Sequence, residues 1–111
     1  MDGEPMKTLI VGENITKNKF LDAVLIGPYD LSASLGIAGE LDNIILIEAV
    51  HKVEKICKES NFPIGYHVIK PNFQEVKSKI KNGYSFIGFS LDFYFLGDKI
   101  RHEMELLHES K

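Results

Sequence analysis

The chain is 111 residues long, and 13 Lys and Arg residues against 16 Asp and Glu residues give it a formal net charge of −3. This length suits one small domain rather than two. Hydrophobic residues make up 44% of the chain and charged residues 26%, a balance that excludes wholesale disorder. The slightly negative charge also excludes the basic surface that nucleic-acid binding requires.

The cysteine content and the start of the chain argue against a secreted protein and against a membrane protein. A single cysteine, Cys57, cannot form an intrachain disulfide or a cysteine-rich metal site, and it favours a reducing, cytoplasmic location. The start, MDGEPMKTLIVGEN, is acidic where a signal peptide is basic, and no apolar run approaches the roughly 18 residues of a membrane span. We expect one domain over residues 1–111, with residues 1–6 either disordered or left over from expression.

In the first half of the chain, short apolar runs precede a long helical pattern. Residues 8–11 (TLIV) and 23–27 (AVLIG) are apolar runs typical of strands, and the second predicts a strand buried on both faces. Residues 28–42 predict a long loop with a helical turn. Residues 43–60 predict a helix with Asp42 as its N-cap. Its predicted apolar stripe consists of Ile44, Ile47, Val50, Ile56 and Cys57.

The second half repeats the alternation of strand and helix. Residues 63–69 and 85–89 predict strands, whereas residues 72–82 and 97–108 predict helices. Asn72 with Glu75 resembles a capping box, and Gly83 suits the end of that helix. Such alternation predicts parallel strands joined by crossover helices. The chain is therefore expected to be an α/β fold, either about half of a (β/α)₈ barrel or a small open sheet.

The segment GPYDLSASLG contains the most unusual candidate site. Function in parallel α/β folds collects after the carboxyl ends of the strands, and Asp30 comes directly after a predicted strand. Gly27 allows close backbone approach, and the small residues that follow can cradle an anion with their N–H groups. An aspartate there can ligate a hard divalent cation. The alternative is that Asp30 caps a helical turn by accepting from the N–H of Ser32 or Ala33.

Three other polar residues lie near predicted strand ends. Glu13 follows the first apolar run, where it either shares a metal with Asp30 or is a solvated loop residue. His67 is either a general base or ligand, or a hydrogen-bonded core residue, with Tyr66 on the opposite side of the strand. Asp92 is either an acidic ligand or a helix cap. An aromatic group without interleaved basic residues indicates core packing or a subunit interface; it comprises Phe86, Phe89, Phe93, Tyr94 and Phe95.

Three segments together resemble a known family. LDAVLIGPYDLSASLGI, GYHVIKPN and NGYSFIGFSLDFYFLGDKIR, in this order, resemble the C-terminal half of the HpcH/HpaI aldolases. These are metal-dependent pyruvate aldolases that cleave 4-hydroxy-2-oxo acids. The resemblance extends from about Leu21 to Leu107, and its most specific part is the run IGPYDLSASLG.

The resemblance implies a fold and a ligand set. It implies the C-terminal half of a (β/α)₈ TIM barrel, completed by self-association or by a missing N-terminal half, and oligomers that exchange a C-terminal helix. It implies that Asp30 and Glu13 ligate a divalent metal (Mg, Mn or Co). Backbone N–H groups around Tyr29 and Asp30 would hold the carboxylate of pyruvate or another 2-oxo acid. The implied substrate-binding residues are Gly27, Pro28, Tyr29, Asp30, Leu31 and Ser32.

The resemblance also implies a reaction, retro-aldol cleavage to pyruvate and an aldehyde. The base His and the oxyanion-stabilising Arg of the family belong to its N-terminal half, which has no counterpart here, and His67 and Arg101 fall at the wrong places to replace them. No catalytic residue is therefore assigned. The alternatives are a non-catalytic half-barrel that binds a metal or a 2-oxo acid or serves oligomerisation, and a flavodoxin-like sheet whose loop 27–36 binds phosphate.

Overall fold

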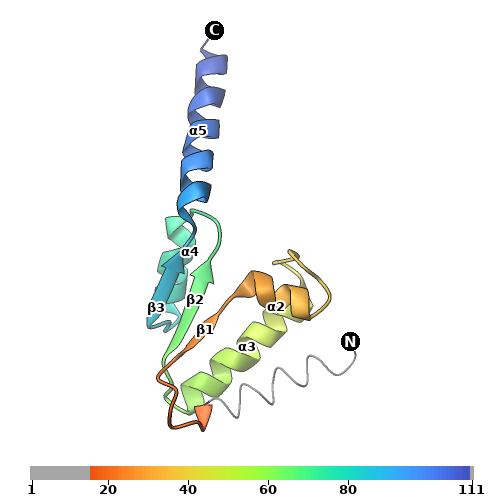
Figure 1. The fold of residues 1–111 in the computed structure, drawn as a ribbon, viewed down its shortest axis with the longest axis vertical. Coiled ribbons are helices and arrows are strands. Elements are labelled where there is room, and N and C mark those ends of the chain that lie inside the picture. Colours follow the sequence, from red (N-terminus) through yellow and green to blue (C-terminus); the bar gives the residue numbers. More distant parts are fainter. Residues whose placement is uncertain (1–15, 111) are drawn as a thin grey trace.

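A computed structural model describes residues 16–110, over which parallel strands alternate with helices. The strands form a three-stranded sheet in the order β1-β2-β3, and both neighbouring pairs are parallel (Figure 1). The predicted α/β alternation is thereby confirmed for this part of the chain; the apolar run 8–11 and Glu13 lie outside the described residues. The elements are β1 (Val24–Ile26), α2 (Pro28–Ser34), α3 (Ile44–Glu59), β2 (Ile64–Val68), α4 (Phe73–Lys81), β3 (Phe86–Phe89) and α5 (Asp92–Glu109).

Two helices differ from the sequence prediction. Residues 28–34 form the helix α2 rather than a loop with one turn, because Pro28 at the first helical position has its φ pre-set for a helix. Helix α5 begins at Asp92 and not at Gly97, which lies inside it. A glycine within a helix costs only about 1 kcal/mol relative to alanine, so it need not mark a boundary.

Helix α3 has the predicted extent but a different cap. The side-chain oxygen of Asn43 accepts a hydrogen bond from the N–H of Ile45 at 2.9 Å, so Asn43 is the N-cap and the prediction of Asp42 is wrong. In α4 Asn72 is the N-cap as predicted, but it accepts from the N–H of Gln74 at 2.9 Å, and the described residues show no reciprocal capping-box bond with Glu75. The cap shift leaves Asp42 outside α3 with its carboxylate available to other groups.

The apolar stripe of α3 is also shifted relative to the prediction. The buried residues are Leu46, Val50 and Cys57, whereas Ile44 is 63% exposed. The wrong part of the prediction is the first turn, where apolar residues at successive positions 44–47 leave the register of the stripe ambiguous. Cys57, at 1% exposure, is the small core residue that its lone position indicated.

The core lies on one face of the sheet, between the strands and α3. Ile26, Ile64 and Val68 point to that face and are buried in one cluster with Leu46 of α3. On the other face Leu25 is 57% exposed, so the expectation that this strand is buried on both faces is wrong for the described residues. Residues 16–110 thus cover only one face of the sheet.

Helix α5 continues beyond the sheet as an extended arm (Figure 1). None of its residues is buried. The apolar side chains that recur at helical spacing along one side are exposed: Phe93, Leu96, Ile100, Met104 and Leu107. Among the helices of residues 16–110, none is long and apolar enough to cross a membrane.

Candidate functional site

The junction of β1 and α2 presents two backbone donors. Gly27 is the N-cap of α2 in an extended conformation, and Pro28, which has no N–H, follows it. The first hydrogen bond into the helix runs from the N–H of Leu31 to the carbonyl of Gly27, at 2.9 Å. The N–H groups of Tyr29 and Asp30 have no acceptor among residues 16–110, as is usual in a first helical turn. The carboxyl end of β1 therefore offers two donors to an anion.

The carboxylate of Asp30 lies at the same junction. Its Oδ2 is 3.4 Å from the position that a Cβ on Gly27 would occupy, so the side chain folds back over the start of α2. The N-terminal end of a helix favours a negative charge, which stabilises the carboxylate there. The capping alternative does not occur, because the described residues give Asp30 no hydrogen bond from Ser32 or Ala33. Its oxygens thus remain available to a cation.

Ser32 stabilises the start of α2 and its contact with the following loop. Its side chain is fully buried, and its Oγ donates to the carbonyl of Tyr29 at 2.6 Å and accepts from the N–H of Gly39 at 3.0 Å. The first bond lies within α2, and the second connects α2 to the loop that follows it. Pro28 is buried, and Leu31 packs against the core, so these residues support the junction from within.

A histidine–serine contact joins the carboxyl ends of β2 and β3. The Nε2–H of His67 donates to the carbonyl of Ser90 at 3.1 Å, since a carbonyl oxygen can only accept. As predicted, His67 faces away from the buried side chains of Tyr66 and Val68. A hydrogen-bonded structural role is therefore the arrangement found for this histidine.

Ser90 is a feature that sequence reasoning missed. Its φ of 55° is in the left-handed region, which is strained for a residue with a side chain, and its buried Oγ has no hydrogen-bond partner among residues 16–110. Strained residues of this kind cluster at active sites and ligand-binding sites. The only signal in the sequence was its position directly after β3, because a backbone angle cannot be read from a single sequence.

The described residues contain no preformed cluster of metal ligands. In residues 16–110 no three His, Cys, Asp or Glu side chains come together as a group that could hold a metal ion. Asp92 serves the first turn of α5, where its Oδ1 accepts from the N–H of Phe93 at 2.7 Å. Asp30 is thus the carboxylate at this edge with its oxygens available. One carboxylate fits Mg²⁺, which is commonly held by one or two carboxylates, substrate and water.

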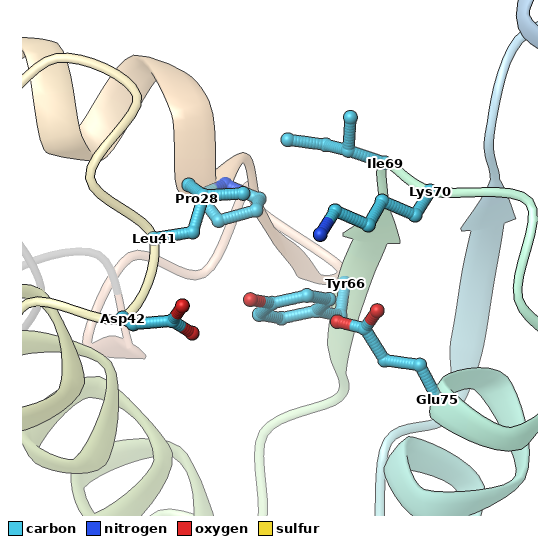
Figure 2. Close-up of a pocket in the computed structure, with 7 residues that line it drawn as sticks. All are labelled: Pro28, Leu41, Asp42, Tyr66, Ile69, Lys70 and Glu75. Carbon is cyan, nitrogen blue, oxygen red and sulfur yellow. The ribbon is translucent and has the colours of Figure 1, made fainter.

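A cavity of about 120 Å³ opens next to this junction, on the helix-covered side of β2 (Figure 2). The sequence does not indicate this cavity, because Asp42 and Glu75 each fit a local role as helix caps. Its lining combines apolar walls with charges of both signs: Pro28, Leu41, Asp42, Tyr66, Ile69, Lys70 and Glu75.

The two tyrosines behind this cavity are held in their neutral form. Burial, followed by the negative charges of Glu75 and Glu54, raises the pKa of Tyr66 to about 12. Burial and the charge of Glu54 likewise raise the pKa of Tyr84. The rings of Tyr66 and Tyr84 pack edge to face at 5.4 Å, and the Nζ of Lys79 lies 4.1 Å from the centre of the Tyr66 ring. At neutral pH the Tyr66 hydroxyl is therefore a hydrogen-bond donor.

The chain is similar in fold to several solved structures. The chain resembles the HpcH/HpaI aldolase from Desulfitobacterium hafniense DCB-2 with a TM-score of 0.82 and 23% identity over 96% of its length. It resembles a HpcH/HpaI aldolase/citrate lyase family protein from Burkholderia cenocepacia J2315 with a TM-score of 0.80 and 23% identity over 90% of its length. Citrate synthase SbnG follows with a TM-score of 0.72 and 19% identity over 96% of the chain. No protein-family model and no curated protein matches the sequence.

These likenesses confirm the predicted fold as part of a TIM-barrel-type aldolase fold. The chain spans only 40%, 38% and 42% of the three solved proteins, so it corresponds to a portion of their barrel. The open sheet of the described residues agrees with this, because a closed barrel leaves no strand edge unpaired.

Proposed function

We propose that the chain is the 2-oxo-acid-binding portion of a metal-dependent carbon–carbon lyase of the HpcH/HpaI type. The observation that carries the proposal is the available carboxylate of Asp30 beside the two unbonded N–H groups at the end of β1. This arrangement occurs in a fold that the chain shares with aldolases. The substrate class is the 4-hydroxy-2-oxo acids, and the product retained here is pyruvate.

The residues of the junction have separate roles in this proposal. The N–H groups of Tyr29 and Asp30 bind the substrate carboxylate, since both donors lack another acceptor in the described part of the chain. The carboxylate of Asp30 is a ligand of a divalent ion (Mg²⁺, Mn²⁺ or Co²⁺), with Glu13 as the proposed second ligand. A bound divalent ion supplies Lewis-acid polarisation of the keto oxygen. Gly27 keeps the space above Asp30 open because it has no Cβ.

A complete enzyme of this type needs residues from outside the described part of the chain. The sheet has one uncovered face, and within residues 16–110 the strands β1 and β3 each have an unpaired edge. Unpaired edges and exposed apolar faces favour association. The rest of a barrel or a second copy of the chain would cover them, and the apolar stripe on α5 would pack against the same partner. A stable monomer in sedimentation would contradict this part of the proposal.

Calorimetry with Mn²⁺ in the presence of pyruvate tests the metal site. We expect saturable binding that Asp30→Ala abolishes. Asp98→Ala is the matched control, because Asp98 is an exposed aspartate on α5 far along the chain from the junction, and it should bind as the unmodified chain does. Unchanged Mn²⁺ affinity in Asp30→Ala would remove this residue from the site.

A pyruvate-release assay with a 4-hydroxy-2-oxo acid and Mg²⁺ or Mn²⁺ separates the enzyme from the non-catalytic alternative. Turnover would support a lyase and require a base in this chain or in a second copy of it. Metal and pyruvate binding without turnover would support a binding module or a catalytic portion that needs its missing half. Co-expression with a segment that supplies a His and an Arg then distinguishes these two, since only the catalytic portion gains turnover.

A further inference from the structure

The cavity beside β2 is separate from the proposed metal site. Pro28 is the one lining residue that also belongs to the junction of β1 and α2, and Asp30 does not line the cavity. The remaining walls come from the loop before α3, from the end of β2 and from α4. The cavity therefore has its own chemistry and does not depend on the proposed lyase function.

An unpartnered hydroxyl points into this cavity. Tyr66 is only 8% exposed and lines the cavity, and among residues 16–110 its hydroxyl has no hydrogen-bond partner (Figure 2). Because the hydroxyl is neutral at physiological pH, it can donate to an anionic group of that molecule.

Charges of both signs surround the hydroxyl. Figure 2 shows the carboxylates of Asp42 and Glu75 on opposite sides of Tyr66, with the ammonium group of Lys70 reaching over the ring. None of these three groups forms an ion pair within the described residues. Asp42 and Glu75 can therefore accept from a cationic group, while Lys70 and the Tyr66 hydroxyl can donate to an anionic one.

We propose that this cavity binds a small zwitterion with one ammonium and one carboxylate group, that is, a small amino acid. The ammonium group binds Asp42 and Glu75, and the carboxylate binds Lys70 and the Tyr66 hydroxyl. The volume of about 120 Å³ equals roughly four waters of liquid, which limits the ligand to a few heavy atoms and a short side chain. Pro28, Leu41 and Ile69 provide the apolar wall for that side chain.

Titration of the full chain with L-alanine, followed by the NMR signals of the Tyr66 ring, tests this proposal. We expect a saturable shift of these signals. Glu75→Gln and Lys70→Met should each weaken alanine binding at least tenfold, because each removes a charged contact to one end of the zwitterion. Glu48→Gln, on the exposed side of α3, is the matched control and should bind alanine as the unmodified chain does.

Ethylamine and acetate, each carrying one of the two charges, distinguish a zwitterion site from a simpler one. We expect both to bind at least tenfold more weakly than alanine. Equal binding of ethylamine and alanine, together with no effect of Lys70→Met, would overturn the proposal in favour of an amine site. No saturable shift with alanine, or equal affinity in Glu75→Gln, Glu48→Gln and the unmodified chain, would also overturn it. The circular dichroism of each variant establishes that it is folded.

Discussion

The two faces of the sheet differ in what covers them. On one face Ile26, Ile64 and Val68 pack against α3 and exclude water. On the other face Leu25 is open to solvent, and Phe86 lies over Gly65 rather than beneath a helix. The same three strands thus have one face that is buried in a core and one face that is exposed to solvent.

This difference explains why the candidate site is incomplete. In a closed barrel the inner face of the sheet is filled by side chains from all its strands, and three strands supply only part of them. The covered face is sufficient to hold the junction at Asp30 in place, because Ser32 and Leu31 connect α2 to that side. The stability of this portion should therefore depend on the covered face, and its activity on what covers the other.

The largest expected effect is a cavity in the covered face. Leu46→Ala should lower the free energy of unfolding by about 2–5 kcal/mol, because Leu46 is 2% exposed and its removal leaves space that the core cannot fill. Leu25→Ala on the open face is the control, with an expected loss of less than about 1 kcal/mol. Urea unfolding of both variants measures the difference. Equal losses would mean that the open face is buried in solution.

A smaller effect should come from crowding on the open face. A Cβ on Gly65 would lie far inside the contact distance of the Phe86 ring, so Gly65→Ala should cost about 1–3 kcal/mol. Gly88→Ala is the control, because its Cβ would lie at an ordinary 3.4 Å from Cδ2 of His67. Urea unfolding again provides the values. A neutral Gly65→Ala would show that the Phe86 ring does not rest on Gly65.

The attachment of the candidate site to the covered face can be weakened selectively. Ser32→Ala removes the bonds to Tyr29 and Gly39 and should cost about 1–2 kcal/mol. In Ser34→Ala the exposed hydroxyl loses only its bond to the carbonyl of Leu31, and we expect almost no change in stability. Faster amide exchange at residues 36–41 in Ser32→Ala alone would show that Ser32 holds this loop against α2. Identical exchange in both variants would contradict it.

The smallest effect is confined to alkaline pH. The pKa of Tyr66 is raised in the folded chain from 10.0 to about 12, mainly by burial, so folding favours the protonated phenol. Its stabilising contribution is complete below pH 10 and is lost as the pH rises toward 12. The free energy of unfolding of the unmodified chain should therefore decline over this range more steeply than that of Tyr66→Phe. Parallel pH profiles would contradict the buried position of this hydroxyl.

The alternation of elements was predictable, because strand and helix periodicities are local properties of the sequence. The strand and helix predicted over 63–69 and 72–82 correspond closely to β2 and α4. The exposure of Leu25 was not predictable. A continuous apolar run is typical of a strand covered on both faces, and the run itself does not show that the described residues cover only one. Local sequence patterns identify strands and helices, but they do not show whether one or both faces of a sheet are covered.

The candidate site was predictable in part for the same reason. Asp30 directly follows an apolar run, and this position can be read from the sequence. The cavity beside Tyr66 could not be read, because Asp42 and Glu75 are far apart in the chain and each has a plausible local role as a cap. The left-handed backbone conformation of Ser90 could not be predicted either, because the sequence suggests this conformation mainly where glycine or asparagine occurs.

Paramagnetic broadening by Mn²⁺ in the presence of pyruvate is the most direct test of the central claim. We expect the amide signals of Tyr29 and Asp30 to broaden first, the effect to disappear in Asp30→Ala, and the effect to persist in Asp98→Ala. Broadening centred on another part of the chain, or unchanged broadening in Asp30→Ala, would contradict the account.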